Sequence, residues 1–214
     1  MASRRAILAG ALAAQLLLLR KALALGSVEK GVYRIRGDVR VNGEPARQGQ
    51  EIRTGDTVTT GPGAELVFVI GRDAYMVRER SSLSFGADIL RVLTGAVLSV
   101  FGSGAQRRIE TPTATIGIRG TGVYVEAEAA RTYVCTCYGE VDLASRADPS
   151  ARETVRTKHH EAPRYIMGSG APQMLMQAPV INHSDAELIL LEGLVGRRPP
   201  FMDSGSTYST VPGR

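Results

Sequence analysis

Several signatures of catalysis and cofactor binding are missing from this sequence of 214 residues. It contains no glycine-rich phosphate loop and no Cys-x-x-Cys-His haem attachment site. It also has no recognisable set of serine, histidine and aspartate, and no pair of carboxylates with a base beside them. These absences predict that the protein is not an enzyme.

Runs of basic residues are missing as well. The net charge is +5, but Arg4, Arg5, Arg20 and Lys21 lie within the first 24 residues, which contain no acidic residue. The remainder of the chain is therefore close to neutral. Because nucleic-acid binding depends on clustered positive charge, we expect no nucleic-acid partner.

The amino-terminal segment, residues 1–24, has the shape of an export signal. Its apolar run from Ala6 to Leu19 is shorter than the roughly 20 residues that a membrane-spanning helix needs. The start Ser3-Arg-Arg-Ala-Ile-Leu8 resembles a twin-arginine signal, and Ala22-Leu-Ala24 supplies small residues for cleavage. We expect a periplasmic or secreted protein with no membrane span in the mature chain. The alternative is an uncleaved amino-terminal anchor.

Helical periodicity is lacking over a long part of the chain. No ten-residue stretch between Val28 and Leu143 shows it, whereas turn signals recur throughout. Asn42-Gly43 predicts a tight hairpin, and the hydrophobic run from Ala64 to Gly71 predicts a strand that is buried on both faces. The pattern predicts an all-β fold, either a sandwich or a solenoid-like stack of short strands.

One helix is predicted late in the chain, at residues 184–195. Ser184 and Glu187 fit a capping box, and the leucines that follow have helical spacing. Gly196 is a suitable stop. These features predict a β domain at residues 28–166, an extension at 167–198 that carries the helix, and a disordered tail at 199–214.

A stretch rich in β-branched residues, Thr111 to Glu126, predicts two strands separated by a glycine turn at Arg119-Gly-Thr-Gly122. The run Thr111-Pro-Thr-Ala-Thr-Ile-Gly-Ile-Arg-Gly-Thr121 resembles the core motif of the FecR domain family. So do the upstream segment Ile52 to Gly61 and the closing segment Tyr138 to Leu143. The most specific positions of this family motif are Thr111, Pro112, Arg119, Gly120 and Thr121.

The resemblance implies an all-β extracytoplasmic domain used for protein interaction or signal sensing. It points to a free-standing exported member of the family rather than a membrane-bound sigma regulator. An envelope protein or a cell-wall component would then be the partner. Because the family shares Arg119 among members with different partners, we expect this residue to form a structural ion pair rather than a ligand contact.

Only two cysteines occur, Cys135 and Cys137, on a predicted strand from Thr132 to Tyr138. Side chains at i and i+2 of a strand point to one face, and their Cα atoms lie about 6.5 Å apart, near the limit for a disulfide. The pair could be a disulfide or a plain structural pair. It could also be a metal site, or a redox or nucleophilic site.

All three histidines, His159, His160 and His183, lie downstream of the cysteines. If the strand near Thr157 pairs near Tyr138, one of the first two histidines could face the thiols and help to form a tetrahedral metal site. Alternatively, His159 and His160 lie at a solvated strand end, and His183 packs in front of the helix.

Two functions from different classes therefore follow from the sequence. The first is a non-catalytic interaction or envelope-sensing module. The alternative is a metal-binding or redox protein whose cofactor is a transition metal such as zinc or iron. Its tentative ligands are Cys135, Cys137, His159, His160 and His183. A Cys-His enzyme is disfavoured because the sequence shows no residue to orient the histidine.

Overall fold

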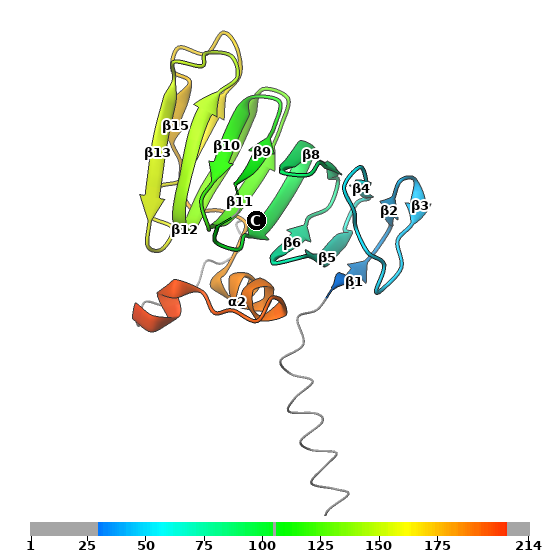
Figure 1. Ribbon diagram of the computed structural model, residues 1–214. Coiled ribbons are helices and arrows are strands. Elements are labelled where there is room, and N and C mark those ends of the chain that lie inside the picture. Colours follow the sequence, from blue (N-terminus) through cyan, green and yellow to red (C-terminus); the bar gives the residue numbers. More distant parts are fainter. Residues whose placement is uncertain (1–29, 105, 205–214) are drawn as a thin grey trace, which may run out of the picture.

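The structure is a computed structural model that describes residues 30–104 and 106–204. Within these residues the chain is all-β with one α-helix, as the sequence predicts (Figure 1). The predicted export segment, residues 1–24, lies outside the described residues. The strands are β1 (Gly31–Arg36), β2 (Val39–Val41), β3 (Glu44–Pro45), β4 (Thr57–Thr60), β5 (Glu65–Ile70), β6 (Asp73–Val77), β7 (Ser82–Phe85), β8 (Ile89–Val100), β9 (Arg107–Glu110), β10 (Ala114–Ile118), β11 (Gly122–Ala127), β12 (Arg131–Ser145), β13 (Arg152–Thr157), β14 (Arg164–Met167) and β15 (Leu175–Gln177). The helix α2 (Asp185–Leu194) and the 3-10 helix η1 (Pro200–Ser204) follow.

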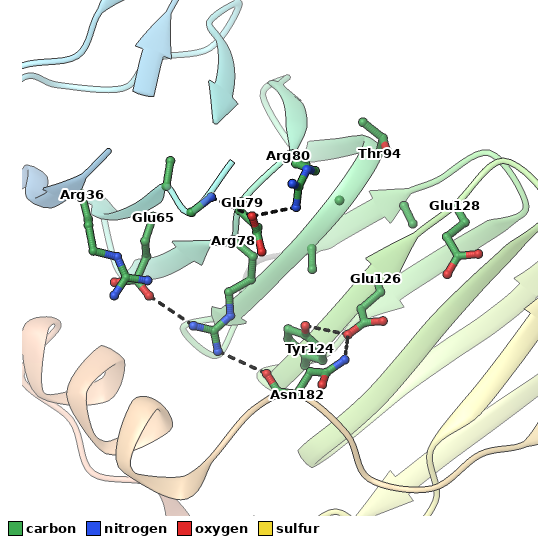
Figure 2. A pocket seen from close by; sticks show the side chains of 15 residues that line it. Arg36, Glu65, Arg78, Glu79, Arg80, Thr94, Tyr124, Glu126, Glu128 and Asn182 are labelled. Atoms are coloured by element: carbon green, nitrogen blue, oxygen red, sulfur yellow. Dashed lines mark hydrogen bonds and ion pairs between the residues drawn. The ribbon is translucent and has the colours of Figure 1, made fainter. Parts of the chain in front are cut away.

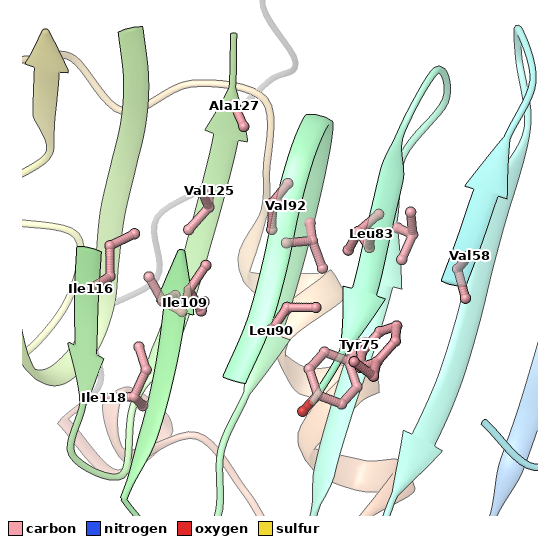
Figure 3. Close-up of a cluster of buried hydrophobic side chains, with 14 of the residues drawn as sticks. Val58, Tyr75, Leu83, Leu90, Val92, Ile109, Ile116, Ile118, Val125 and Ala127 are labelled. Atoms are coloured by element: carbon pink, nitrogen blue, oxygen red, sulfur yellow. The ribbon is translucent and has the colours of Figure 1, made fainter. Parts of the chain in front are cut away.

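The strands form two layers that are joined into one sheet, in which β8, β9, β10, β12 and β11 close into a small barrel. Sheet A has the order β1-β5-β6-β8-β11-β12-β14-β15, and sheet B has the order β3-β2-β4-β7-β8-β9-β10-β12-β13. All neighbours are antiparallel except β8 and β9. Apolar side chains from both sheets fill the space between them (Figure 3). The long strands β8 and β12 belong to both sheets and join the two layers.

Both shared strands change sheets at a glycine. In β8, residues from Gly95 onward pair with sheet A, and the preceding residues pair with sheet B. In β12 the change occurs at Gly139. Gly95 has φ +85° and Gly139 has φ +90°, in the left-handed region that residues with a Cβ rarely adopt. Each glycine therefore allows its strand to bend and to pair in both sheets.

Gly95→Ala is expected to destabilise the protein far more than Gly43→Ala does. Gly43 has nearly the same φ, +84°, but open space around it, so its replacement adds only backbone strain of about 1 kcal/mol. A Cβ at Gly95 would also lie 2.5 Å from Ser81 Cα. This collision should cost about 1–3 kcal/mol more, which urea unfolding would measure. Equal losses in the two variants would show that the bend in β8 tolerates a side chain.

The central strands of sheet A are covered on both faces, which explains why β5 and β6 are buried almost throughout. In β5, Leu66 and Phe68 face sheet B, whereas Val67 and Val69 face the other way. That second face is covered by buried leucines of α2, which contacts β6 and β8. The predicted strand from Ala64 to Gly71 with two buried faces is therefore confirmed.

The local predictions at the turn and the helix are also confirmed. Asn42 and Gly43 connect β2 to β3 with positive φ at both residues. Ser184 is the N-cap residue of α2, and its backbone N–H donates to Glu187 Oε2 at 2.9 Å. Gly196 ends the helix with φ +70°.

The carboxyl-terminal predictions need two corrections. The sheet extends past the predicted domain end at residue 166, because β14 ends at Met167 and β15 adds a further strand to sheet A. The disordered tail predicted from residue 199 is wrong for its first residues. Pro200–Ser204 form η1, and Phe201 is buried against the face of sheet A that α2 covers, so burial of this ring orders the chain here. Residues 205–214 lie outside the described part of the chain.

Candidate metal centre

The two cysteines lie on the half of β12 that belongs to sheet A. Strand alternation turns Tyr133, Cys135 and Cys137 toward the face that α2 covers. Both cysteines are 0% exposed and their thiols are free. Cys137 Sγ donates to the Cys135 carbonyl oxygen at 3.7 Å. The pair is thus held as two thiols on one face, as the strand period predicted.

His160 reaches the cysteines because β13 pairs with β12. Thr157 is opposite Gly139, so the turn after β13 lies beside Cys137. The His160 backbone N–H donates to the Cys137 carbonyl at 2.9 Å, and its Nδ1 lies 3.4 Å from Cys135 Sγ. His160 has φ +55°, an uncommon backbone conformation for a residue with a side chain. Strain of this kind is often found at functional sites.

His183 comes from the segment in front of α2. Its Nδ1 lies 2.6 Å from the Ile181 carbonyl oxygen, and its Nε2 lies 3.0 Å from His160 Nδ1. The ring stacks on Tyr124, with centroids 4.7 Å apart. Cys135, Cys137, His160 and His183 are all buried, and their potential ligand atoms lie within 4.8 Å of one another.

Asp185, in the first turn of α2, connects the remaining histidine to this group. Its Oδ1 accepts from His159 Nε2 at 2.9 Å and from His160 Nε2 at 3.1 Å. His159 also stacks on Phe201, with centroids 4.4 Å apart. His159 therefore supports Asp185 rather than facing the thiols. His159, His160 and Asp185 form a second compact group, but its contacts are those of a carboxylate accepting two N–H bonds.

Hydrogen-bond partners determine which ring nitrogens carry protons. The Ile181 carbonyl can only accept, so His183 Nδ1 donates to it, and a neutral His183 has its lone pair on Nε2. The Asp185 carboxylate accepts from His160 Nε2, so a neutral His160 has its lone pair on Nδ1. These two lone pairs face each other at 3.0 Å. A proton shared by the two rings, or a metal ion between them, would relieve the repulsion between these lone pairs.

The spacing of the four atoms is close to that of a tetrahedral metal site. Zinc–sulfur bonds of about 2.3 Å and zinc–nitrogen bonds of about 2.0–2.1 Å imply sulfur–nitrogen edges of about 3.6 Å and nitrogen–nitrogen edges of about 3.3 Å. The observed distances are 3.4 Å between Cys135 Sγ and His160 Nδ1, and 3.0 Å between the two imidazoles. These two edges are slightly shorter than those of a zinc site, and all four ligand atoms lie within 4.8 Å of one another.

Electrostatics favour a thiolate at one of the two cysteines. Burial by itself would raise the pKa of Cys135, but hydrogen bonds with Cys137, His160 and His183 hold that pKa well below its usual value. Burial, and then the neighbouring Cys135 sulfur, raise the pKa of Cys137 well above its usual value. Burial would lower the pKa of His160, yet contacts with Cys135 and Asp185 raise it. These shifts favour a negative charge on Cys135 next to the His160 imidazole.

Polar contacts hold the segment that carries His183 in place (Figure 2). Arg78 of β6 donates to the Asn182 carbonyl at 3.3 Å and to Glu187 Oε1 at 2.7 Å. Glu126 of β11 accepts from Asn182 Nδ2 at 2.7 Å and from the Tyr124 hydroxyl at 2.8 Å. Arg78, Tyr124, Glu126 and Asn182 line a cleft of about 480 Å³ beside the buried group. They orient His183 before any ligand binds.

The residues of the predicted family motif serve the scaffold. The hydroxyls of Thr111 and Thr113 both contact the Thr132 hydroxyl, at 2.6 and 2.7 Å, and so connect the start of β10 to β12. Thr121 donates to the Glu140 carbonyl at 2.7 Å, next to Gly120 with φ +67°. Pro112 is exposed. Arg119 is exposed and forms the predicted ion pair with Asp142 at 2.7 Å, whereas the absence of a ligand contact stays a prediction.

Four of the five predicted metal ligands are thus brought together, and the fifth supports them. The alternative that His159 and His160 lie at a solvated strand end is wrong, because they are only 7% and 5% exposed. The packing role for His183 holds in part, since it stacks on Tyr124. Sequence reasoning missed Asp185. Its only signal is its place directly after the helix cap, where an acidic residue is expected in any case because it suits the helix dipole.

Cys135, His160 and Asp185 also line up in the order of a nucleophile, a base and an orienting acid. Asp185 is thus the orienting residue that the sequence did not reveal. However, Cys135 is 0% exposed, so a substrate cannot reach its sulfur in this conformation. A metal ion that binds during folding needs no such access. The burial therefore favours metal binding over nucleophilic catalysis.

Comparisons with known proteins add little to this geometry. No family model and no curated protein matches the chain, so the FecR resemblance remains a prediction. Two crystal structures of candidate anti-sigma factors from Parabacteroides distasonis are similar to it, with TM-scores of 0.48 and 0.47 and identities of 12% and 11%. These similarities cover 64% and 63% of this chain, and 65% and 71% of the respective neighbours. Likenesses this weak support no conclusion about function.

Within residues 30–104 and 106–204, no helix combines the length and the apolar character needed to cross a bilayer.

Proposed function

We propose that this protein binds one zinc ion through Cys135, Cys137, His160 and His183. The observation that supports this most strongly is the pair of imidazole nitrogens, His183 Nε2 and His160 Nδ1, that lie 3.0 Å apart beside a buried thiol. Each imidazole uses its other nitrogen to bind a carboxylate or a backbone carbonyl. This is the arrangement by which proteins orient metal-binding histidines.

The ligand set favours zinc over other metals. Two sulfurs and two imidazoles suit a tetrahedral ion of intermediate softness, and four protein ligands leave no open position for a substrate. Such a closed site has a structural or regulatory role. Because His183 precedes α2 while the cysteines lie on β12, the ion would fasten the carboxyl-terminal extension onto sheet A.

The strand geometry of the thiols supports the same proposal. Cys135 and Cys137 extend from one strand with nearly parallel Cβ vectors, so a disulfide between them would require the strand to kink. In an oxidising compartment this resistance would keep both thiols available for a metal ion. The site is therefore compatible with the export that the amino-terminal sequence predicts.

Metal analysis of protein purified without a chelator or a histidine tag tests the proposal. We expect one zinc per chain, and a cobalt-substituted form with sulfur-to-cobalt charge-transfer absorption. Cys135→Ser should abolish that absorption and lower the zinc content well below one. Glu161→Gln, next to His160 in sequence, should leave both unchanged. Absence of zinc, or thiols found joined as a disulfide, would contradict the proposal.

Asp185→Asn is expected to weaken zinc binding by about 10–100-fold, because the carboxylate orients His160 and makes it a better ligand. Glu187→Gln removes the same charge from the same helical turn without touching a histidine. It should lower the stability of the metal-free protein but change zinc affinity little. Competition with a chromogenic chelator would measure both affinities. Similar zinc affinities for the two variants would show that Asp185 acts only on the helix.

The exported interaction or sensing role remains a proposal that rests on the FecR-like motif. The motif residues stabilise the β scaffold, as the contacts of Thr111, Thr113 and Thr121 indicate. An interaction with an envelope protein or a cell-wall component is compatible with a closed zinc site. Crosslinking of the exported protein in intact cells would test it. Recovery of the uncrosslinked chain alone, with the leader still attached, would argue against it.

A further inference from the structure

Three methionines lie together at the edge of sheet A formed by β14 and β15. In this hairpin, Tyr165 is opposite Met176, and the Met167 N–H donates to the Met174 carbonyl at 2.8 Å, which continues the ladder by one pair. Residues opposite each other in an antiparallel ladder share a face, as do residues two apart on one strand. Tyr165, Met167, Met174 and Met176 therefore occupy one face.

This face is the one that carries the cysteines, farther out than α2 reaches. Tyr165 is opposite Tyr133 of β12, and their rings contact with centroids 5.6 Å apart. Met176 is 43% exposed, and Met167 and Met174 are half-buried. On the opposite face of the hairpin, Ile166 belongs to the core between the sheets and Leu175 packs against it.

None of the three methionines belongs to either buried cluster. Cβ atoms of opposed residues lie about 4.5–5.5 Å apart, and diagonal neighbours lie within reach of long side chains. Each thioether sulfur is two bonds beyond its Cβ on an unbranched, flexible chain. The three sulfurs can therefore converge on one point at the surface.

We propose that Met167, Met174 and Met176 form a surface site for one soft monovalent cation, such as Cu(I). Thioether sulfur is a soft ligand that selects Cu(I) over hard ions. The methionines contribute no charge, and Arg131 stands opposite Met167, with its guanidinium 5.3 Å from the Tyr165 ring centroid. Glu128 neutralises Arg131 at 3.0 Å. Because these surroundings carry no net charge, they attract divalent ions only weakly.

The inference does not depend on the zinc site, because the two sites share no residue. Silver(I) is the probe, since it resembles Cu(I) without changing oxidation state. Zinc-loaded protein carrying ¹³C-labelled methionine methyl groups is titrated with up to one equivalent of silver nitrate and followed by NMR. We expect the methyl signals of Met167, Met174 and Met176 to shift together while zinc stays bound. Met76, which is buried in the core, and Met202, which is 37% exposed, serve as internal references.

The variant Met174→Leu with Met176→Leu should weaken silver binding at least tenfold, whereas Met202→Leu should not change it. Equal shifts at Met202 would overturn the inference, because any exposed thioether would then suffice. Release of zinc without methionine shifts would also overturn it, but would support the thiolate site. Methionine shifts in a protein that binds no zinc would uphold this inference and contradict the zinc proposal.

Discussion

Zinc added to the chelator-stripped, reduced protein is expected to raise its thermal midpoint by roughly 8–16 °C. An ion that binds only the folded state at 1,000 times its dissociation constant stabilises that state by about 4 kcal/mol. For a domain of this size, each kcal/mol shifts the midpoint by about 2–4 °C. Differential scanning calorimetry with and without zinc would measure the shift. If the stripped protein is unfolded at 25 °C, zinc should instead restore the circular dichroism of the β fold.

Two controls separate the site from general ionic effects. Magnesium prefers oxygen ligands and should not change the midpoint. His183→Ala removes one ligand from the segment in front of α2, so its midpoint should respond to zinc far less than that of the parent. A zinc-induced rise of the same size in His183→Ala and in the parent would show that the ion binds elsewhere.

Leu191→Ala is expected to lower the free energy of unfolding by about 2–5 kcal/mol. Leu191 is 0% exposed on α2 and belongs to the cluster that covers sheet A, so its truncation leaves a cavity. The thermal midpoint should fall by roughly 4–20 °C. Urea unfolding of the zinc-loaded and zinc-free proteins would measure the loss in each state.

Ile189 provides the matched control on the same helix, because it is 40% exposed. Ile189→Ala should cost less than about 1 kcal/mol, since little apolar area leaves the core. Equal losses in the two variants would mean that α2 does not dock through its leucine stripe. The helix would then not be the element that holds His183 against sheet A.

Local sequence patterns predict only part of the candidate site. The two-residue period of a strand places Cys135 and Cys137 on one face, and pairing of the next strand brings His160 beside them. Both steps follow from short-range patterns. His183 lies 23 residues beyond His160, across a hairpin and a connecting segment, and no periodicity predicts where it lies. The role of Asp185 could not be predicted either, because an aspartate suits the start of a helix whether or not a histidine lies near it.

Sequence patterns alone were sufficient for the all-β class, for the Asn42-Gly43 hairpin and for the limits of α2, because each depends on neighbours within a few residues. They were also sufficient to single out the cysteines. Which face of sheet A the cysteines occupy, and which histidines meet them there, depends on the docking of α2 and the bend of β12 at Gly139. These contacts join residues far apart in the chain. Their energies come from apolar burial and strand pairing that only the folded arrangement brings about.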